Sequence, residues 1–308
     1  MLRVLCKCIP FIFLLGCSVK VPITWKGRVL HKQVKPLPLV YEEYGDPTAK
    51  TLLFLHGFGE NRYTWRFLVP SLAQKYHLIM VDLKGFGASP KPKDDYYSIY
   101  DQAHIINDFI EEKKLKNITL VGRSLGGGVA LVLALLQKDN LIEKNIEKMI
   151  LINTISYKQN LPSMMEILNY PIIGYVGIHL LSNAYMAKEG YRYAFYNDNL
   201  IPQESVDIAT EYLAFPQAKY AYLKTVNQLV PDDISLIEKR YSEIDIPTLI
   251  LWGKEDVSIW VEKAYRLHRA LKKSYLKVFP NVAHAPQEEV PELVGKEILL
   301  FMEENHYL

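Results

Sequence analysis

A short glycine-rich stretch, residues 121–127, sets the strongest limit on how this 308-residue chain can fold. The β-branched run at 117–121 predicts a buried strand, and the apolar segment at 129–137 predicts a helix packed on a sheet. Ser124 therefore lies at a strand-to-helix turn within a Gly-x-Ser-x-Gly pattern. Such a turn is so tight that glycines two residues before and after the serine avoid clashes with neighbouring backbone. The pattern predicts a serine that projects from the end of the strand, next to a helix N-terminus that favours developing negative charge.

From Pro36 onward the sequence alternates between strand and helix patterns. Short apolar runs predict strands over residues 39–44, 51–56, 77–81, 117–121, 149–152, 247–252 and 276–279. Helical patterns lie between or after them, over residues 64–75, 99–114, 129–137, 259–271 and 291–304. Strands separated by helices in this way favour a mostly parallel sheet with helices on both faces, which is an α/β fold.

The alternation stops at Asn153. The following segment shows helical patterns over residues 164–168, 184–196, 203–213 and 218–230, with many aromatic residues and no clear buried strand. We therefore expect a helical cap at 154–241 that is inserted into an α/β core made of 36–153 and 242–308.

The composition of the chain excludes several functions. The formal net charge is +2, so there is no basic field for nucleic acid. The three cysteines, Cys6, Cys8 and Cys17, all lie near the N-terminus. This position rules out a cysteine nucleophile, a thiolate zinc site and disulfides in the body of the chain. No motif implies a metal or a redox cofactor, and nothing indicates an oligomeric state.

The N-terminus resembles an export signal. Arg3 and Lys7 accompany an apolar run at 9–15, which is too short to span a bilayer but suits a signal peptide. The run ends in Leu-Leu-Gly-Cys-Ser, which resembles the lipobox at which bacterial lipoproteins are cleaved and lipidated. We expect a signal peptide at 1–17, lipidation of Cys17 and a basic tether at 18–35, with an uncleaved apolar anchor as the alternative. The protein would then be attached to a membrane of the bacterial cell envelope.

An activated serine needs a base, and the base needs an acid that orients it. In an open parallel sheet such groups lie on loops at the carboxyl ends of strands. His284 follows the last predicted strand and is the candidate base, whereas the Gly-Phe-Gly run after His56 indicates a different role for that residue. Asp256 follows the preceding predicted strand and is the candidate acid, with Glu255 as its competitor. Asp82 also follows a strand, but we expect it to hold its own glycine-rich loop.

Ser124, Asp256 and His284 occur in that order, with His-Gly-Phe-Gly at 56–59 upstream. This arrangement resembles the α/β-hydrolase fold superfamily over about residues 36–301. The resemblance is strongest to esterase-like members that have a helical cap after the sixth strand. It implies an eight-stranded, mostly parallel sheet.

The resemblance also assigns roles to individual residues. It implies that Ser124 is the nucleophile of an acyl-enzyme mechanism, His284 the base and Asp256 the acid that orients the imidazole. It implies that the backbone N–H groups of Phe58 and Leu125 form the oxyanion hole, which side-chain identity alone does not reveal.

Residue chemistry limits the reactions that this superfamily offers. Haloalkane dehalogenases and epoxide hydrolases have aspartate in place of Ser124, which disfavours both. Proline iminopeptidases have a different oxyanion loop, although Glu189, Glu204 or Glu211 could hold a substrate amine. Carbon–carbon hydrolases usually have a small polar residue where Arg123 stands. A serine esterase, lipase or thioesterase is the main interpretation, with the peptidase, the carbon–carbon hydrolase and a non-catalytic anchored binding protein as alternatives.

The composition of the cap indicates the substrate. Tyrosines 157, 170, 175, 185, 191, 193, 196, 212, 220, 222 and 241 lie in or beside it, and its first part is strongly apolar. Tyrosine combines a large apolar area with one hydroxyl, so such a cap can cover a mostly apolar pocket and offer a few polar contacts. No dense basic cluster is present, which disfavours acyl-CoA. We predict hydrolysis of small to medium uncharged acyl esters and lower activity on long triacylglycerols.

Overall fold

The computed structural model describes residues 23–25, 28–30, 37–161 and 163–303. Most of them fold around a seven-stranded sheet with the strand order β3-β5-β4-β6-β7-β8-β9. The strands are β3 (Tyr41–Tyr44), β4 (Thr51–Leu55), β5 (His77–Val81), β6 (Ile118–Arg123), β7 (Ile146–Ile152), β8 (Thr248–Gly253) and β9 (Ser274–Phe279). β3 runs antiparallel to β5, and the other neighbouring pairs are parallel. The seven strands that the sequence predicts are all present.

The resemblance predicted an eighth strand in this sheet, and that count is wrong for the described residues. Two further strands, β1 (Ile23–Trp25) and β2 (Arg28–Leu30), pair antiparallel with each other in a separate two-stranded sheet. They form no ladder with β3, so they do not extend the main sheet.

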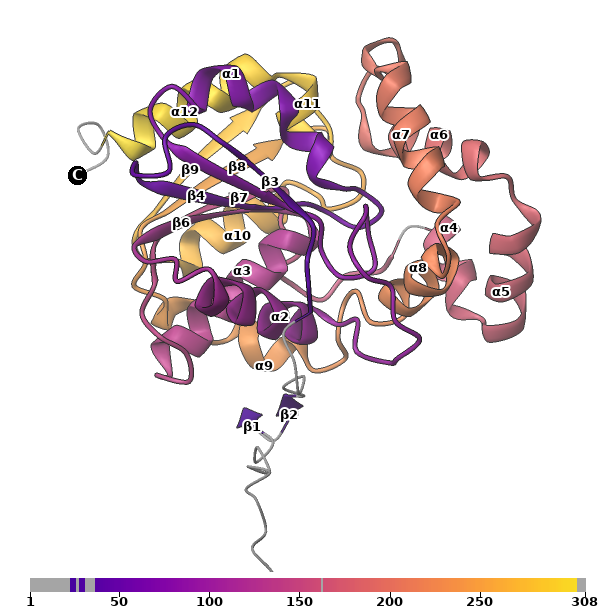
Figure 1. Cartoon of the computed structure of the whole chain (residues 1–308), viewed down its shortest axis with the longest axis horizontal. Coiled ribbons are helices and arrows are strands. Elements are labelled where there is room, and N and C mark those ends of the chain that lie inside the picture. The colour runs from indigo at the N-terminus through magenta and orange to yellow at the C-terminus, as the bar shows by residue number, and fades with distance from the viewer. Residues whose placement is uncertain (1–22, 26–27, 31–36, 162, 304–308) are drawn as a thin grey trace, which may run out of the picture.

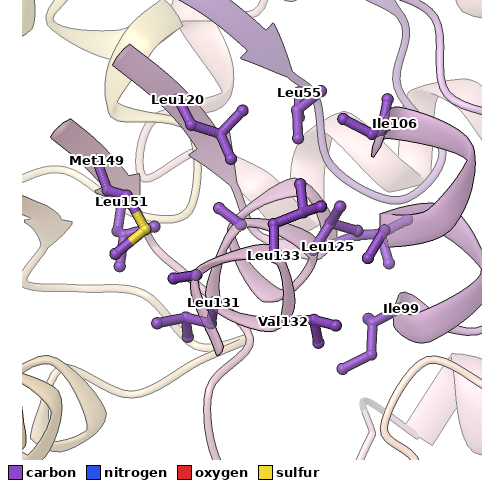
Figure 2. Close-up of a cluster of buried hydrophobic side chains, with 14 of the residues drawn as sticks. Leu55, Ile99, Ile106, Leu120, Leu125, Leu131, Val132, Leu133, Met149 and Leu151 are labelled. Carbon is purple, nitrogen blue, oxygen red and sulfur yellow. The ribbon is translucent and has the colours of Figure 1, made fainter. Parts of the chain in front are cut away.

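Helices cover both faces of the sheet, as predicted (Figure 1). One face packs against α2 (Ile99–Glu112), α3 (Leu125–Lys138) and α10 (Glu262–Ala270), and the other against η1 (Arg62–Leu68), α1 (Val69–Leu72) and α12 (Pro291–Met302). Alternate residues of a buried strand point to opposite faces. In β4, Leu53 and Leu55 therefore join one core cluster, and Leu52 and Phe54 join the other. Figure 2 shows the first cluster, where side chains of α2, α3 and strands β4, β6 and β7 meet.

Local sequence explains how two of these helices begin. Ser98 caps α2, because its hydroxyl accepts a hydrogen bond from the Asp101 N–H and the Asp101 carboxylate accepts one from the Ser98 N–H. Pro70 lies in the first turn of α1, directly after the 3₁₀ helix η1. The helix predicted over 64–75 is therefore divided near this proline, as its lack of an N–H leads one to expect.

A group of helices follows β7 and lies to one side of the sheet (Figure 1). Its members are α4 (Ser163–Glu166), η2 (Ile167–Asn169), α5 (Pro171–Leu180), α6 (Asn183–Ala194), η3 (Asp198–Leu200), α7 (Gln203–Leu213) and α8 (Ala218–Val226). We call this group the cap. Helix α5 was not among the predicted helices, because nearly all of its residues are apolar and two are glycines, so its sequence lacks the period of a surface helix.

The segments that flank the cap pack into the core. Tyr157 before it, and α9 (Ile234–Glu238) and η4 (Tyr241–Glu243) after it, contribute side chains to the same cluster as α3. The cap helices run from Ser163 to Val226, and the wider insertion at 154–241 stays a prediction. Within the described ranges, no helix is both long enough and apolar enough to cross a bilayer.

Candidate active site

Ser124 lies in a strained turn between β6 and α3. Its φ is +51° and its ψ is −114°, a backbone conformation that non-glycine residues rarely adopt. The flanking glycines permit the turn because neighbouring backbone comes so close to them that a side chain would clash. A Cβ on Gly122 would lie 2.5 Å from the carbonyl oxygen of Gly126, and a Cβ on Gly126 would lie 2.1 Å from that of Leu55. The Gly-x-Ser-x-Gly spacing is thus required by packing, and it presents the serine where β6 ends.

The structure brings Ser124, His284 and Asp256 into one hydrogen-bonded chain. His284 Nε2 lies 3.1 Å from Ser124 Oγ, and His284 Nδ1 lies 2.7 Å from Asp256 Oδ2. Each residue follows a different parallel strand, namely β6, β8 and β9, and all three are buried. This is the geometry in which a histidine can take a proton from a serine while a carboxylate fixes its tautomer.

The Asp256 carboxylate is held by further donors. Its Oδ1 accepts hydrogen bonds from the backbone N–H groups of Ser258 at 2.7 Å and Ile259 at 3.0 Å. Its Oδ2 also accepts one from Asn153 Nδ2 at 2.6 Å. Asn153 was not among the predicted site residues, because its side chain is not ionisable and cannot serve as the acid. Its position at the end of β7 was the signal that it belongs to the site, since it supports the acid instead of replacing it.

The competing candidates have other partners. Glu255 Oε2 accepts a hydrogen bond from the Val282 N–H at 3.2 Å. Asp82 accepts hydrogen bonds from the N–H groups of Arg62 and Ala88, so it holds its own loop as expected. His56 is fully buried, donates from Nδ1 to the Gly57 carbonyl and accepts from the Leu83 N–H at Nε2. Burial lowers the pKa of His56, which favours the neutral imidazole that this pairing requires.

Phe58 lines the same cavity as Ser124, and Leu125 directly follows Ser124 in the chain. Leu125 begins α3, and Phe58 lies in the loop after β4; the Gly126 N–H donates to the His56 carbonyl at 3.2 Å and joins the two segments. Among the described residues, neither the Phe58 N–H nor the Leu125 N–H donates to a protein acceptor. Two N–H groups without a protein acceptor are what an oxyanion hole requires.

A cavity of about 360 Å³ opens over Ser124 and His284, between the core and the cap. Apolar cap residues line much of it, including Ile167, Leu168 and Ile178. Four cap tyrosines also line it, at positions 185, 191, 193 and 222, whereas Tyr157 and Tyr241 pack in the core. Burial raises the pKa of both Tyr191 and Tyr222 well above the ordinary pKa of tyrosine, so the two hydroxyls stay neutral.

Acidic residues of the cap contribute little to the cavity. Of the three predicted amine-binding candidates, Glu189 lines the cavity and pairs with Arg192 at 3.2 Å, and Glu204 and Glu211 are not among the lining residues. Within the part of the chain that the structure describes, no three His, Cys, Asp or Glu side chains are grouped as metal ligands would be.

The sequence matches a known family model. The model for the alpha/beta hydrolase fold matches residues 50–291, which contain Ser124, Asp256 and His284. The chain belongs to the α/β-hydrolase family. This α/β-hydrolase is 29% identical over 266 residues to YugF, an uncharacterized hydrolase of Bacillus subtilis, with 85% of this chain and 93% of the relative covered.

Two further similarities carry lipase names. Lipase 1 of Psychrobacter immobilis is 26% identical over 259 residues, covering 82% of this chain and 76% of that protein. The crystal structure of a putative lipase from Acinetobacter baumannii superposes with a TM-score of 0.72 at 28% identity, covering 88% and 89% of the two chains. Proteins named epoxide hydrolases also match, so membership of the family does not by itself choose the reaction.

Proposed function

We propose that this α/β-hydrolase cleaves small to medium uncharged carboxylic esters through an acyl-enzyme intermediate. The observation that carries the proposal is the continuous Ser124–His284–Asp256 chain beneath an apolar cavity. The lipase names among similar proteins support the same class of reaction.

The geometry supports a two-step acyl transfer. Ser124 Oγ attacks the ester carbonyl carbon while His284 Nε2 accepts the hydroxyl proton, and Asp256 stabilises the resulting imidazolium. The N–H groups of Phe58 and Leu125 donate to the oxyanion. The tetrahedral intermediate collapses when the imidazolium gives its proton to the leaving alcohol. Water, deprotonated by His284, then attacks the acyl-enzyme, and the imidazolium returns this proton to Ser124 Oγ as the acid is released.

The volume and the lining of the cavity favour this class of substrate. Its volume of about 360 Å³ lies at the lower end of the range of ligand pockets, so it suits short to medium acyl groups better than a long triacylglycerol. Its lining is mainly apolar, and the charged groups in it are largely paired: Arg123 with Glu60, and Glu189 with Arg192. An uncharged ester therefore fits better than a highly charged thioester such as acyl-CoA.

The competing activities have specific weaknesses. An epoxide hydrolase of this fold would need an aspartate nucleophile, and this chain has Ser124 at that position. An aminopeptidase would need an unpaired acid near the serine, and Glu189 pairs with Arg192. A binding protein without turnover would not need the aligned Oγ–Nε2–Nδ1–Oδ2 chain.

An ester panel separates these activities. We would measure hydrolysis of p-nitrophenyl esters of graded chain length, an emulsified long-chain triglyceride and an aminoacyl-naphthylamide, with Ser124→Ala as the blank. The proposal expects a maximum at short to medium acyl chains. Preference for the triglyceride would indicate a true lipase, and preference for the amide a peptidase. Failure of a fluorophosphonate probe to label Ser124 would favour the binding protein.

The membrane attachment predicted from the N-terminus is part of the same proposal. Cys17 lies outside the described residues, so the argument for lipidation rests on sequence. The outer surface of the cap is compatible with a nearby bilayer: Ile172 and Leu180 of α5 are both 80% exposed, and no charged residue lies between Tyr170 and Leu181. An ester that partitions into lipid would then lie close to the cap.

We expect Cys17→Ala to move the protein from the membrane fraction to the soluble fraction. Stable attachment needs two or more acyl chains, and this change removes the residue that would carry them. The measurement is fractionation of expressing bacterial cells, with Cys8→Ala as the matched control that should stay in the membrane fraction. Unchanged membrane retention of Cys17→Ala, or a mature protein that still begins at Met1, would contradict the proposal.

A further inference from the structure

Arg123, the last residue of β6, is a buried cation directly before Ser124. The residue is only 2% exposed. Its Nε and one terminal nitrogen donate to the carbonyl oxygen of His284, at 3.1 and 2.8 Å. Its other terminal nitrogen lies 2.5 Å from Glu60 Oε1. Arg123 therefore touches the backbone of the candidate base as well as a carboxylate from a different loop.

Glu60 connects Arg123 to the loop at residues 56–60, which follows β4, contains Phe58 and is here called the oxyanion loop. Its Oε1 pairs with Arg123, and its Oε2 accepts a hydrogen bond from the Gly57 N–H at 2.8 Å. Gly57 precedes Phe58, which lines the cavity beside Ser124 and whose N–H is the proposed oxyanion donor. The approach between the two segments is close, because a Cβ on Gly57 would lie 2.5 Å from a terminal nitrogen of Arg123. The Arg123–Glu60 ion pair thus links the turn that carries Ser124, the oxyanion loop and the loop that carries His284.

The His284 peptide is held from two sides. Its N–H donates to the carbonyl of Ala194 at the end of the cap helix α6, at 2.8 Å, and its carbonyl accepts from Arg123 of the core. Glu289 holds the neighbouring N–H groups of Ala283 and Ala285. Among these contacts, Arg123 connects the His284 backbone to the strand that carries the nucleophile.

Burying a charged pair is expensive, and an apolar pair of similar volume often stabilises a protein equally well. A fork of guanidinium donors, however, can bind a carbonyl and a carboxylate at the same time with fixed angles. We infer that Arg123 and Glu60 are positioning residues, which hold the His284 imidazole and the Phe58 N–H in register around Ser124. This inference rests on the proposed function, because it assigns a role in the same acyl transfer.

Arg123→Met tests the inference, since methionine fills most of the apolar stem but cannot donate hydrogen bonds. We expect kcat on the best ester to fall about 10- to 100-fold, with KM changed much less, because a displacement of about 1 Å at a catalytic group can cost this much. The rate of fluorophosphonate labelling of Ser124 should fall in parallel. Arg123→Lys should recover part of kcat only, because one ammonium lacks the fork geometry.

A double variant separates positioning from stability. Arg123→Met leaves the Glu60 carboxylate buried without its cation, which should also lower Tm. Adding Glu60→Gln removes that charge, so Arg123→Met/Glu60→Gln should recover Tm. Its kcat should stay low, because the His284 carbonyl still lacks its donors. Recovery of kcat together with Tm would show that the pair is merely structural.

The control is Arg240→Met. Arg240 is buried and forms an ion pair with the half-buried Asp139, at 2.9 and 2.7 Å, at the far end of α3 from Ser124. A helix of this length separates the two sites by about 20 Å. We expect Arg240→Met to lower Tm and leave kcat unchanged. If Arg123→Met keeps wild-type kcat while Ser124→Ala is inactive, the inference alone is overturned; a wild-type protein inert to both esters and fluorophosphonate would overturn the proposed function and the inference with it.

Discussion

Ser124→Ala and His284→Ala should each lower the kcat of ester hydrolysis by about 10⁴- to 10⁶-fold, the loss seen when such residues are removed from serine proteases. The reason is the 3.1 Å contact between Ser124 Oγ and His284 Nε2, because without either atom no activated nucleophile forms. The double variant should be no worse than the single variants, since the two residues act as a unit. The measurement is kcat and kcat/KM on the best p-nitrophenyl ester.

Two control variants test whether the loss of activity is specific to Ser124 and His284. Ser258 lines the same cavity, and His179 lies exposed on α5, where its ring contacts the Tyr175 carbonyl. Ser258→Ala and His179→Ala should retain most of the activity. Circular dichroism and Tm should show that the two inactive variants are folded. Near wild-type turnover in folded Ser124→Ala or His284→Ala would refute the proposed mechanism.

Asp256→Asn should lower kcat by about 10⁴-fold, the effect of the same change in a serine protease triad. The Asp256 carboxylate now accepts hydrogen bonds from His284, Asn153 and the N–H groups of Ser258 and Ile259. Asparagine has an NH₂ group in place of one carboxylate oxygen. This NH₂ group would either face the donors that now bond to Asp256 or turn toward His284 Nδ1. In the second case Nδ1 becomes an acceptor and Nε2 carries the proton, so Nε2 can no longer accept the proton of Ser124.

The adjacent acid supplies the control for this prediction. Glu255 accepts a hydrogen bond from the Val282 N–H, and glutamine at this position keeps an oxygen that can do the same. Glu255→Gln should therefore leave kcat within about threefold of wild type, because it removes no group that contacts His284. A larger loss in Glu255→Gln than in Asp256→Asn would mean that the acid has been assigned to the wrong residue.

Much of the architecture could be predicted because it depends on local patterns. The runs at β4 and β8 and the centre of β6 are mostly apolar, which is typical of strands buried on both faces. The glycines around Ser124 are needed because this sharp strand-to-helix turn brings neighbouring backbone too close for a Cβ. The order of strands and helices then restricts the topology to a parallel sheet, whose strand ends collect the reactive residues.

Other features of the structure could not be predicted, each for a physical reason. The eighth strand came from the resemblance and not from any residue pattern, and the sheet of the described residues has seven strands. Helix α5 consists almost entirely of apolar residues, so periodicity could not reveal it. The choice between Asp256 and Glu255 depended on side-chain direction at the end of β8, which neighbouring positions in a loop do not encode.

The sequence by itself determined the class of fold, the turn that carries Ser124 and the strand ends on which Asp256 and His284 lie, because these depend on short stretches of chain. Only the tertiary structure decided which atoms meet: that Asn153 supports Asp256, and that Arg123 links His284 to Glu60. Those contacts join residues that are about 60 to 160 positions apart in the sequence, and they form because the parallel sheet places the ends of β4, β6, β7, β8 and β9 side by side. Hydrogen-bond partners at such separations are set by packing and not by local pattern.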